Sequence, residues 1–165
     1  MTEVGCLKDG CFQNLQVEGL TQNPKPLGGI QIVGDTLATI ESNASLVVFN
    51  ADAGSSRVIT MPPAEAGREI TFVWEVEQGS SDRVFTCAGS DKFVGNIFTV
   101  QEGNAAGDGD AIPVAAGSQT ITFLDDINIG SYVNLLCYTD GKWLVTGHIV
   151  SDAVPTTAGM IDVGI

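Results

Sequence analysis

The strongest constraint on the fold of this chain is the alternation of apolar with other residues in short segments bounded by turn residues. Residues 69–76 show it most clearly, because Ile70, Phe72, Trp74 and Val76 fall on one face of an extended strand. No stretch of ten or more residues clearly repeats apolar positions at the spacing of an amphipathic helix. The pattern therefore predicts an all-β protein with few helices.

A β-hairpin is predicted near the C-terminal end. Two segments rich in β-branched and aromatic residues, 131–139 and 142–150, flank the dipeptide Asp140-Gly141. Asp-Gly is a strong signal for a two-residue type I′ turn, in which both central residues have positive φ. The turn therefore fixes an expected register for the two strands.

The faces of this hairpin also follow from the turn. Counting back from it pairs Cys137 with roughly Leu144. One face of the second strand is predicted to carry Trp143, Val145 and Ile149. The other face is predicted to carry Leu144, Thr146, His148 and Val150.

Seven weaker segments complete the predicted strands. They are residues 30–33, 36–41, 46–50, 57–61, 84–88, 97–101 and 120–124. Short strands at such regular spacing predict an antiparallel β-sandwich or jelly-roll-like domain, or a β-barrel-like one, over residues 30–150. Pro62 and Pro63 are expected to end the strand before them, because proline cannot donate to a ladder.

The two ends of the chain differ from this domain in composition. Residues 1–29 are predicted to form an extended arm, because Gly, Asn, Gln and Pro are mixed there with isolated apolar residues. Two interpretations of the arm stay open, a mobile tail or a segment covered by a partner surface. Under the second, the candidate contacts are Leu7, Phe12, Leu15 and Val17. Residues 151–165 are predicted to be a tail, in which residues 160–163 can add one strand.

Composition and charge argue against several classes of protein. With 44% hydrophobic and 16% charged residues, the chain is not expected to be disordered as a whole. Seven basic and 20 acidic residues give a net charge of −13, which repels phosphate, so nucleic-acid binding is not expected. No apolar run approaches the ~18 residues of a membrane span, and no signal peptide is recognised at the N-terminus.

The sequence carries few residues suited to catalysis, so neither enzyme activity nor a cofactor is predicted. His148 is the single histidine and lies in a strand-like run, and no nucleophile elbow or phosphate-binding loop is present. The loop over residues 102–110 gathers Glu102, Asn104, Asp108 and Asp110. Two interpretations of this loop stay open, a calcium site or a solvated acidic loop, and its spacing does not match an EF-hand.

The four cysteines divide into two pairs. Cys87 and Cys137 lie in strand-like runs, where cysteine behaves as a small hydrophobe. Cys6 and Cys11 are expected to be free thiols, or a disulfide formed after release into an oxidising medium. Their spacing and the single histidine predict no zinc site.

Two blocks of the sequence resemble a module common in tailed-phage structural proteins. Residues 60–72 read TMPPAEAGREITF, and the module has TLPxAxxGxxFTF. Residues 130–145 read GSYVNLLCYTDGKWLV, and the module has GSxVxLxxDGxxWxVxG. The similarity extends over about residues 45–150. Met61 and Ile70 depart from the pattern, and the second block is longer before its Asp-Gly turn.

Chains of this size with the module resemble phage capsid decoration, or cement, proteins. The resemblance implies a homotrimer on the outer capsid surface of the virion, bound to the major capsid protein through arms that reach across neighbouring capsomers. The alternative that it leaves open is a tail- or head-fibre module that binds a host receptor or glycan. Sugar platforms would then be expected at Trp143, Tyr132 and Tyr138, although core or cross-strand packing is the commoner use of such residues.

Overall fold

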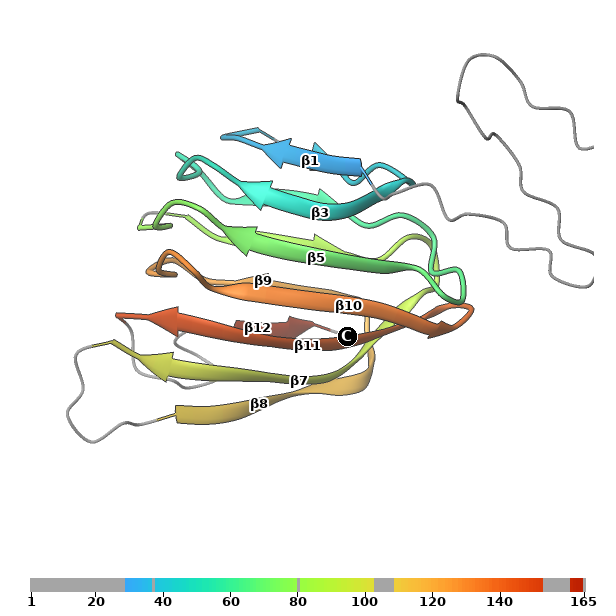
Figure 1. Cartoon of the computed structure of the whole chain (residues 1–165). Coiled ribbons are helices and arrows are strands. Elements are labelled where there is room, and N and C mark those ends of the chain that lie inside the picture. The colour runs from blue at the N-terminus through green and yellow to red at the C-terminus, as the bar shows by residue number, and fades with distance from the viewer. Residues whose placement is uncertain (1–28, 37, 80, 103–108, 153–160, 165) are drawn as a thin grey trace, which may run out of the picture.

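The computed structural model describes residues 29–36, 38–79, 81–102, 109–152 and 161–164. These residues form twelve strands and no helix, which confirms the predicted all-β class (Figure 1). Within them, no helix long and apolar enough to cross a membrane is found. The arm contacts Leu7, Phe12, Leu15 and Val17, and also Cys6 and Cys11, lie outside the described residues.

The strands form two sheets. In spatial order, the seven-stranded sheet contains β1 (Gly29–Val33), β3 (Ala44–Phe49), β5 (Glu69–Trp74), β10 (Tyr132–Thr139), β11 (Lys142–Ser151), β7 (Lys92–Gln101) and β8 (Gly109–Ser118). The five-stranded sheet contains β12 (Ile161–Gly164), β9 (Thr120–Phe123), β6 (Arg83–Thr86), β4 (Arg57–Thr60) and β2 (Ala38–Thr39).

The chain alternates between the two sheets from β1 to β6. Strands β1, β3 and β5 are neighbours in one sheet, while β2, β4 and β6 are neighbours in the other. All four pairings within these two sets are parallel, because each passage through the opposite sheet returns the chain in the same direction. The expectation of purely antiparallel sheets was therefore wrong, and both sheets are mixed.

The core lies where side chains from the two sheets meet. Phe72 of β5 and Phe85 of β6 have ring centroids 4.5 Å apart, and Phe85 lies 4.8 Å from Phe123 of β9. Phe49 and Trp74 add two more rings, with centroids 5.0 Å apart. All five rings are almost fully buried, so this aromatic cluster joins the two sheets into one core.

The predicted faces are confirmed within β5 and β11, but Val76, predicted on the buried face, lies beyond the end of β5 and is half-buried. Ile70, Phe72 and Trp74 are buried on β5, and Thr71 and Val73 lie on its other side. On β11, the buried residues include Trp143, Val145 and Ile149, as the alternation predicted.

The predicted hairpin forms, but its turn and register differ from expectation. Gly141 has a φ of 78°, whereas Asp140 does not have positive φ, so the turn is not type I′. A bulge between Cys137 and Thr139 makes Cys137 the partner of Trp143 rather than of Leu144. Because paired residues share a face, the bulge places two core residues opposite each other and keeps Leu144 outside.

The sequence pattern did not predict one long strand, β8. β8 falls partly in the segment interpreted as an acidic loop, and it contains Pro113 opposite Asn96. Proline is tolerated there because β8 is an edge strand. The strand predicted over residues 36–41 is present only as the two residues of β2. The additional strand predicted over residues 160–163 is present as β12.

Candidate interaction face

The outward side chains of the seven-stranded sheet form a large surface, called here the outer face, that no other described part of the chain covers. One row crosses the sheet in register, each member being paired with the next. It consists of Ile32, Val48, Val73, Tyr132, His148, Phe98 and Ala111. These residues alternate along their strands with buried ones, so the row points away from the core.

Large apolar and aromatic side chains are exposed on this face. Its most exposed members are Ile30 at 69%, Ile32 at 65%, Tyr138 at 52%, Phe98 at 47%, Tyr132 at 45% and Leu136 at 36%. Exposed large apolar residues scattered singly are ordinary, but a contiguous apolar patch marks an interaction site. The other two large apolar residues exposed in the described part are Val58, on the five-stranded sheet, and Ile129.

Few charges lie on the outer face. Among its described strand positions, the charged residues are Glu69 on β5, Lys142 on β11 and Lys92 on β7. The two lysines are register partners and line a hollow of about 250 Å³ together with Tyr138. The ion pairs of the described part are Arg57–Asp35 and Arg68–Glu65, so neither lysine is paired with a carboxylate there.

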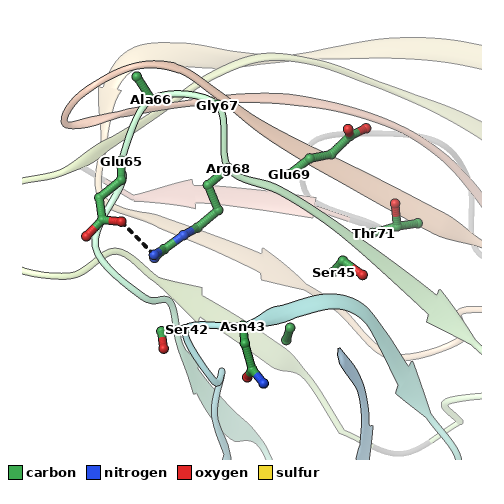
Figure 2. Close-up of a pocket in the computed structure, with 10 residues that line it drawn as sticks. Ser42, Asn43, Ser45, Glu65, Ala66, Gly67, Arg68, Glu69 and Thr71 are labelled. Atoms are coloured by element: carbon green, nitrogen blue, oxygen red, sulfur yellow. Dashed lines mark hydrogen bonds and ion pairs between the residues drawn. The ribbon is translucent and has the colours of Figure 1, made fainter. Parts of the chain in front are cut away.

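A polar groove of about 610 Å³ borders this face, at the end where β3 and β5 begin (Figure 2). Arg68 crosses it to Glu65 at 2.8 Å and also donates to the carbonyl O of Pro63 at 2.8 Å. The rest of the lining consists of small and polar residues, namely Ser42, Asn43, Ala44, Ser45, Ala66, Gly67, Glu69 and Thr71. This lining contains no aromatic ring, so the groove is not a stacking site for a sugar.

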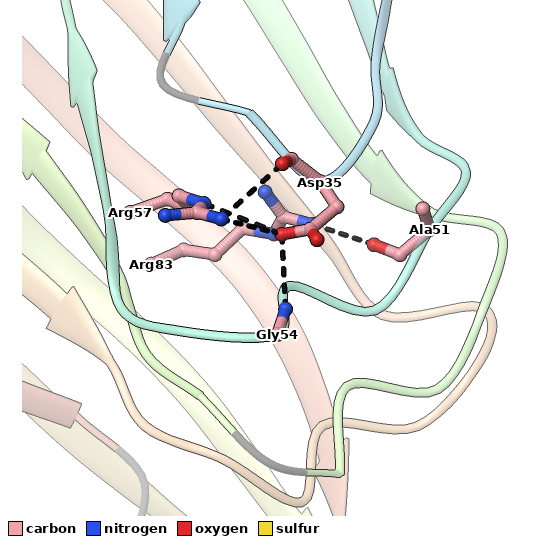
Figure 3. A network of polar contacts seen from close by, with 5 residues as sticks. All are labelled: Asp35, Ala51, Gly54, Arg57 and Arg83. Carbon is pink, nitrogen blue, oxygen red and sulfur yellow. Dashed lines mark hydrogen bonds and ion pairs between the residues drawn. The ribbon is translucent and has the colours of Figure 1, made fainter.

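A second polar network ties loops to the edge of the core (Figure 3). The Asp35 carboxylate accepts hydrogen bonds from the Gly54 N–H and from Arg57, each at 2.9 Å. The Gly54 bond, followed by the Arg57 bond, lowers the pKa of Asp35 below its usual value. These contacts join the segments that carry Asp35 and Gly54 to the start of β4 at Arg57, so a structural role explains the network.

Arg83 extends this network into the core. Its side chain is fully buried, and it donates to the carbonyl O of Ala51 at 2.6 Å and to Gln78 Oε1 at 2.8 Å. Its guanidinium also lies 4.3 Å from the centroid of the Phe49 ring. Burial lowers the pKa of Arg83, and the hydrogen bonds and ring contact offset part of the cost of burying the charge.

The described residues hold no group of three or more potential metal ligands. Glu102 accepts a hydrogen bond from Asn128, and Asp110 accepts one from the backbone N–H of Ala111 at 2.8 Å. Asn104 and Asp108, the other members of the calcium hypothesis, lie outside the described residues.

The described cysteines and the histidine do not form a catalytic pair. His148 is on the outer face, stacked on Phe98 with centroids 5.7 Å apart, whereas Cys137 is buried opposite Trp143. Burial raises the pKa of the Cys87 thiol to about 12 and also raises the pKa of Cys137. Both behave as the small core hydrophobes that their strand positions predicted.

The three aromatic residues considered as sugar platforms separate into two groups. Trp143 is fully buried, so of the two uses considered for it, core packing is confirmed and a sugar platform is excluded. Tyr132 and Tyr138 are exposed on the outer face. Ile32 and Phe98 lie in segments that were predicted as strands without an assigned face, and the same alternation predicts which way they point.

Comparisons of the chain with protein-family models, with curated proteins and with solved structures give no match.

Proposed function

We propose that this protein is a phage capsid decoration protein, which binds the major capsid protein on the outer surface of the virion as a homotrimer. Its role is to hold neighbouring capsomers together and so stabilise the head, without enzymatic activity and without a cofactor. In finer terms, its two mixed sheets belong to a β-sandwich. The proposal starts from the resemblance of residues 60–72 and 130–145 to a phage structural module.

The observation that carries it is the contact between these two blocks. The Gly141 N–H donates to the carbonyl O of Ala64 at 2.9 Å, and the Ala66 N–H donates to the Asp140 carboxylate at 2.9 Å. The Gly67 N–H donates to the carbonyl O of Cys137 at 2.7 Å. Residues that carry the resemblance in each block therefore bond to the other block, which supports treating both as one structural module.

The surface chemistry supports a role in protein binding. Interfaces are enriched in Tyr, Phe and other aromatic residues and depleted of charge at their centres. The outer face has this composition in a chain whose net charge is −13. The remaining acidic surface keeps the protein soluble and disfavours adhesion to packaged DNA.

The direct test is co-sedimentation with expanded, empty capsids of the phage that encodes the chain. We expect saturable binding and an increase in the temperature at which the capsids break open. Unexpanded shells serve as the comparison, because a decoration protein recognises a lattice created by expansion. Lack of binding to expanded shells over a range of salt concentrations would reject the proposal.

A fibre module that binds a glycan is the second candidate, favoured by exposed Tyr132 and Tyr138. Aromatic rings with a wet hydroxyl end are suited to stacking on sugars. A glycan array distinguishes the two functions, since binding that is lost in Tyr132→Ala and Tyr138→Ala would favour the fibre module. We expect no glycan binding by the decoration protein.

A further inference from the structure

We infer that the outer face of the seven-stranded sheet is the surface through which copies of this chain associate with one another. The inference rests on the homotrimer of the proposed function and assigns its subunit interface. The occupant of the face is thus a second copy of the chain. The charge and the apolar exposure of the face favour this occupant.

The small charge of the outer face allows identical acidic chains to meet there. Two copies at −13 repel each other unless the surfaces that meet are nearly neutral. The described strand positions of the outer face carry two lysines and one glutamate, which gives 2 − 1 = +1. Glu69 is separated from Lys142 and Lys92 by β10, so a neighbouring copy can place its lysines against Glu69 without bringing like charges together.

Apolar exposure distinguishes the two sheets. Six of the eight large apolar residues exposed in the described part lie on the outer face. In the five-stranded sheet, one outward row joins Thr39, Thr60, Thr86 and Thr120 in register. The next outward row includes Val58, Val84 and Thr122, and of these Val58 is the one large apolar residue that is exposed. Threonine hydroxyls stay hydrated at little cost, whereas the exposed isoleucines and aromatic rings gain free energy when a partner removes them from water.

The two edge strands of the seven-stranded sheet differ in how they are protected. At one edge of the seven-stranded sheet, β8 carries Pro113, which blocks pairing with another strand. At the other edge, β1 has the sequence GIQIV, with neither a proline nor a charge. Ile30 and Ile32, which are 69% and 65% exposed, belong to this edge strand. A neighbouring copy that covers the outer face near β1 removes these two side chains from water.

The area of the outer face limits the size of each contact. Seven strands at about 4.8 Å spacing span about 30 Å, and six residues at about 3.3 Å span about 20 Å. The outer face therefore extends over roughly 600 Å², and a trimer divides it between two neighbours, so each contact is smaller than the ~800 Å² that each partner buries in a standard interface. Its central aromatic residues, Tyr132 and Phe98, are of the kind that dominates binding energy.

The test inserts charge into the centre of the outer face of the full-length protein. The variant Tyr132→Glu/Phe98→Glu changes two exposed side chains, so circular dichroism and the melting temperature should show an intact fold. The matched control is Val58→Glu, because Val58 is 41% exposed and lies on the five-stranded sheet, against 45% and 47% for the two test residues. Sedimentation equilibrium is measured for all three proteins.

We expect wild type and Val58→Glu to be trimers. We expect the double variant to have a subunit dissociation constant at least 100-fold higher. A double variant that stays trimeric with wild-type affinity would overturn the inference and leave the proposed function standing. If it stays trimeric but no longer binds expanded capsids, the outer face docks on the shell, and the inference is likewise wrong.

A second measurement needs no substitution. The chain has two tyrosines, Tyr132 and Tyr138, and both are exposed on the outer face. Tyrosine iodination followed by peptide mapping should therefore be slower in the trimer than in protein diluted below its dissociation constant, by tenfold or more. Equal rates would overturn the inference. A chain that is monomeric at every concentration overturns both the inference and the homotrimer of the proposed function, while capsid co-sedimentation still decides independently whether the protein binds the capsid.

Discussion

Gly95 of β7 lies against Val145 of β11 so closely that a Cβ atom at residue 95 would be 2.0 Å from the Val145 carbonyl O. Gly95 also has a φ of 143°, which side chains of L-residues rarely adopt. The contact occurs where two ten-residue parallel strands are paired along their whole length. Glycine at this position therefore permits the close approach of the two strands beneath the outer face.

We expect Gly95→Ala to lower the free energy of unfolding by about 2–5 kcal/mol, because steric overpacking and backbone strain add together. Urea unfolding followed by tryptophan fluorescence measures the change. Gly117→Ala is the control, since Gly117 has a φ of 107° but a Cβ atom added there would meet no atom within 4 Å. Equal losses in the two variants would show that strain alone acts and that the close contact is unimportant.

Arg83 gives a prediction on a buried charge. Arg83→Ala should cost about 3–5 kcal/mol of stability, because it leaves a cavity and removes the donors to Ala51 and Gln78. Arg83→Met should cost less, because it fills most of the volume without a charge to desolvate. Thermal and urea unfolding of both variants measure the difference. If methionine were no better than alanine, the hydrogen bonds rather than the packing would dominate at this site.

Asp35 gives a prediction on pH. Its pKa in the folded protein is lowered below the usual value of 3.8, first by the Gly54 N–H and then by Arg57. The ionised carboxylate therefore contributes stability above pH 3.8, and this contribution is lost as the pH falls through the lowered pKa. Asp35→Asn should be less stable than wild type at pH 7, and the difference should shrink below pH 3.8.

Urea unfolding of wild type and Asp35→Asn between pH 7 and pH 2.5 tests this expectation. Glu77→Gln is the control for removing an exposed acidic group elsewhere in the domain. A difference between wild type and Asp35→Asn that stays constant across this range would mean that the ionised carboxylate contributes nothing specific.

The N-terminal arm gives a prediction on function. Replacing Leu7, Phe12, Leu15 and Val17 together by serine should abolish binding to expanded capsids, if these side chains contact the shell. The melting temperature should stay unchanged, because the substitutions lie outside residues 29–164, which contain all the described strands. Replacing four polar residues of the arm, Thr2, Gln13, Asn14 and Gln16, by serine is the control. Undiminished capsid binding by the apolar variant would remove the arm from the mechanism.

The alternation of residue types determined which side chains point inward. On β5 and β11 the buried sets were predictable, because side chains on a strand alternate between its two faces whatever the strand pairs with. The same rule predicts that Ile32 and Phe98 lie on the side opposite their buried neighbours. Pro62 and Pro63 also ended β4 as expected, because proline lacks the N–H that a ladder needs.

Which strands pair, in which relative direction and in which register, was decided only by the tertiary structure. Whether β3 pairs with β5 in parallel depends on the passage through the opposite sheet, which no local pattern specifies. The bulge beside Cys137 exists because Trp143 and Cys137 must both reach the core, a requirement that counting from the turn does not include. The outer face arises in the same way, since seven segments distant in sequence become one surface only when long-range pairing aligns them. Local alternation thus determined the two sides of each strand, whereas the packing of the shared core determined which strands lie side by side.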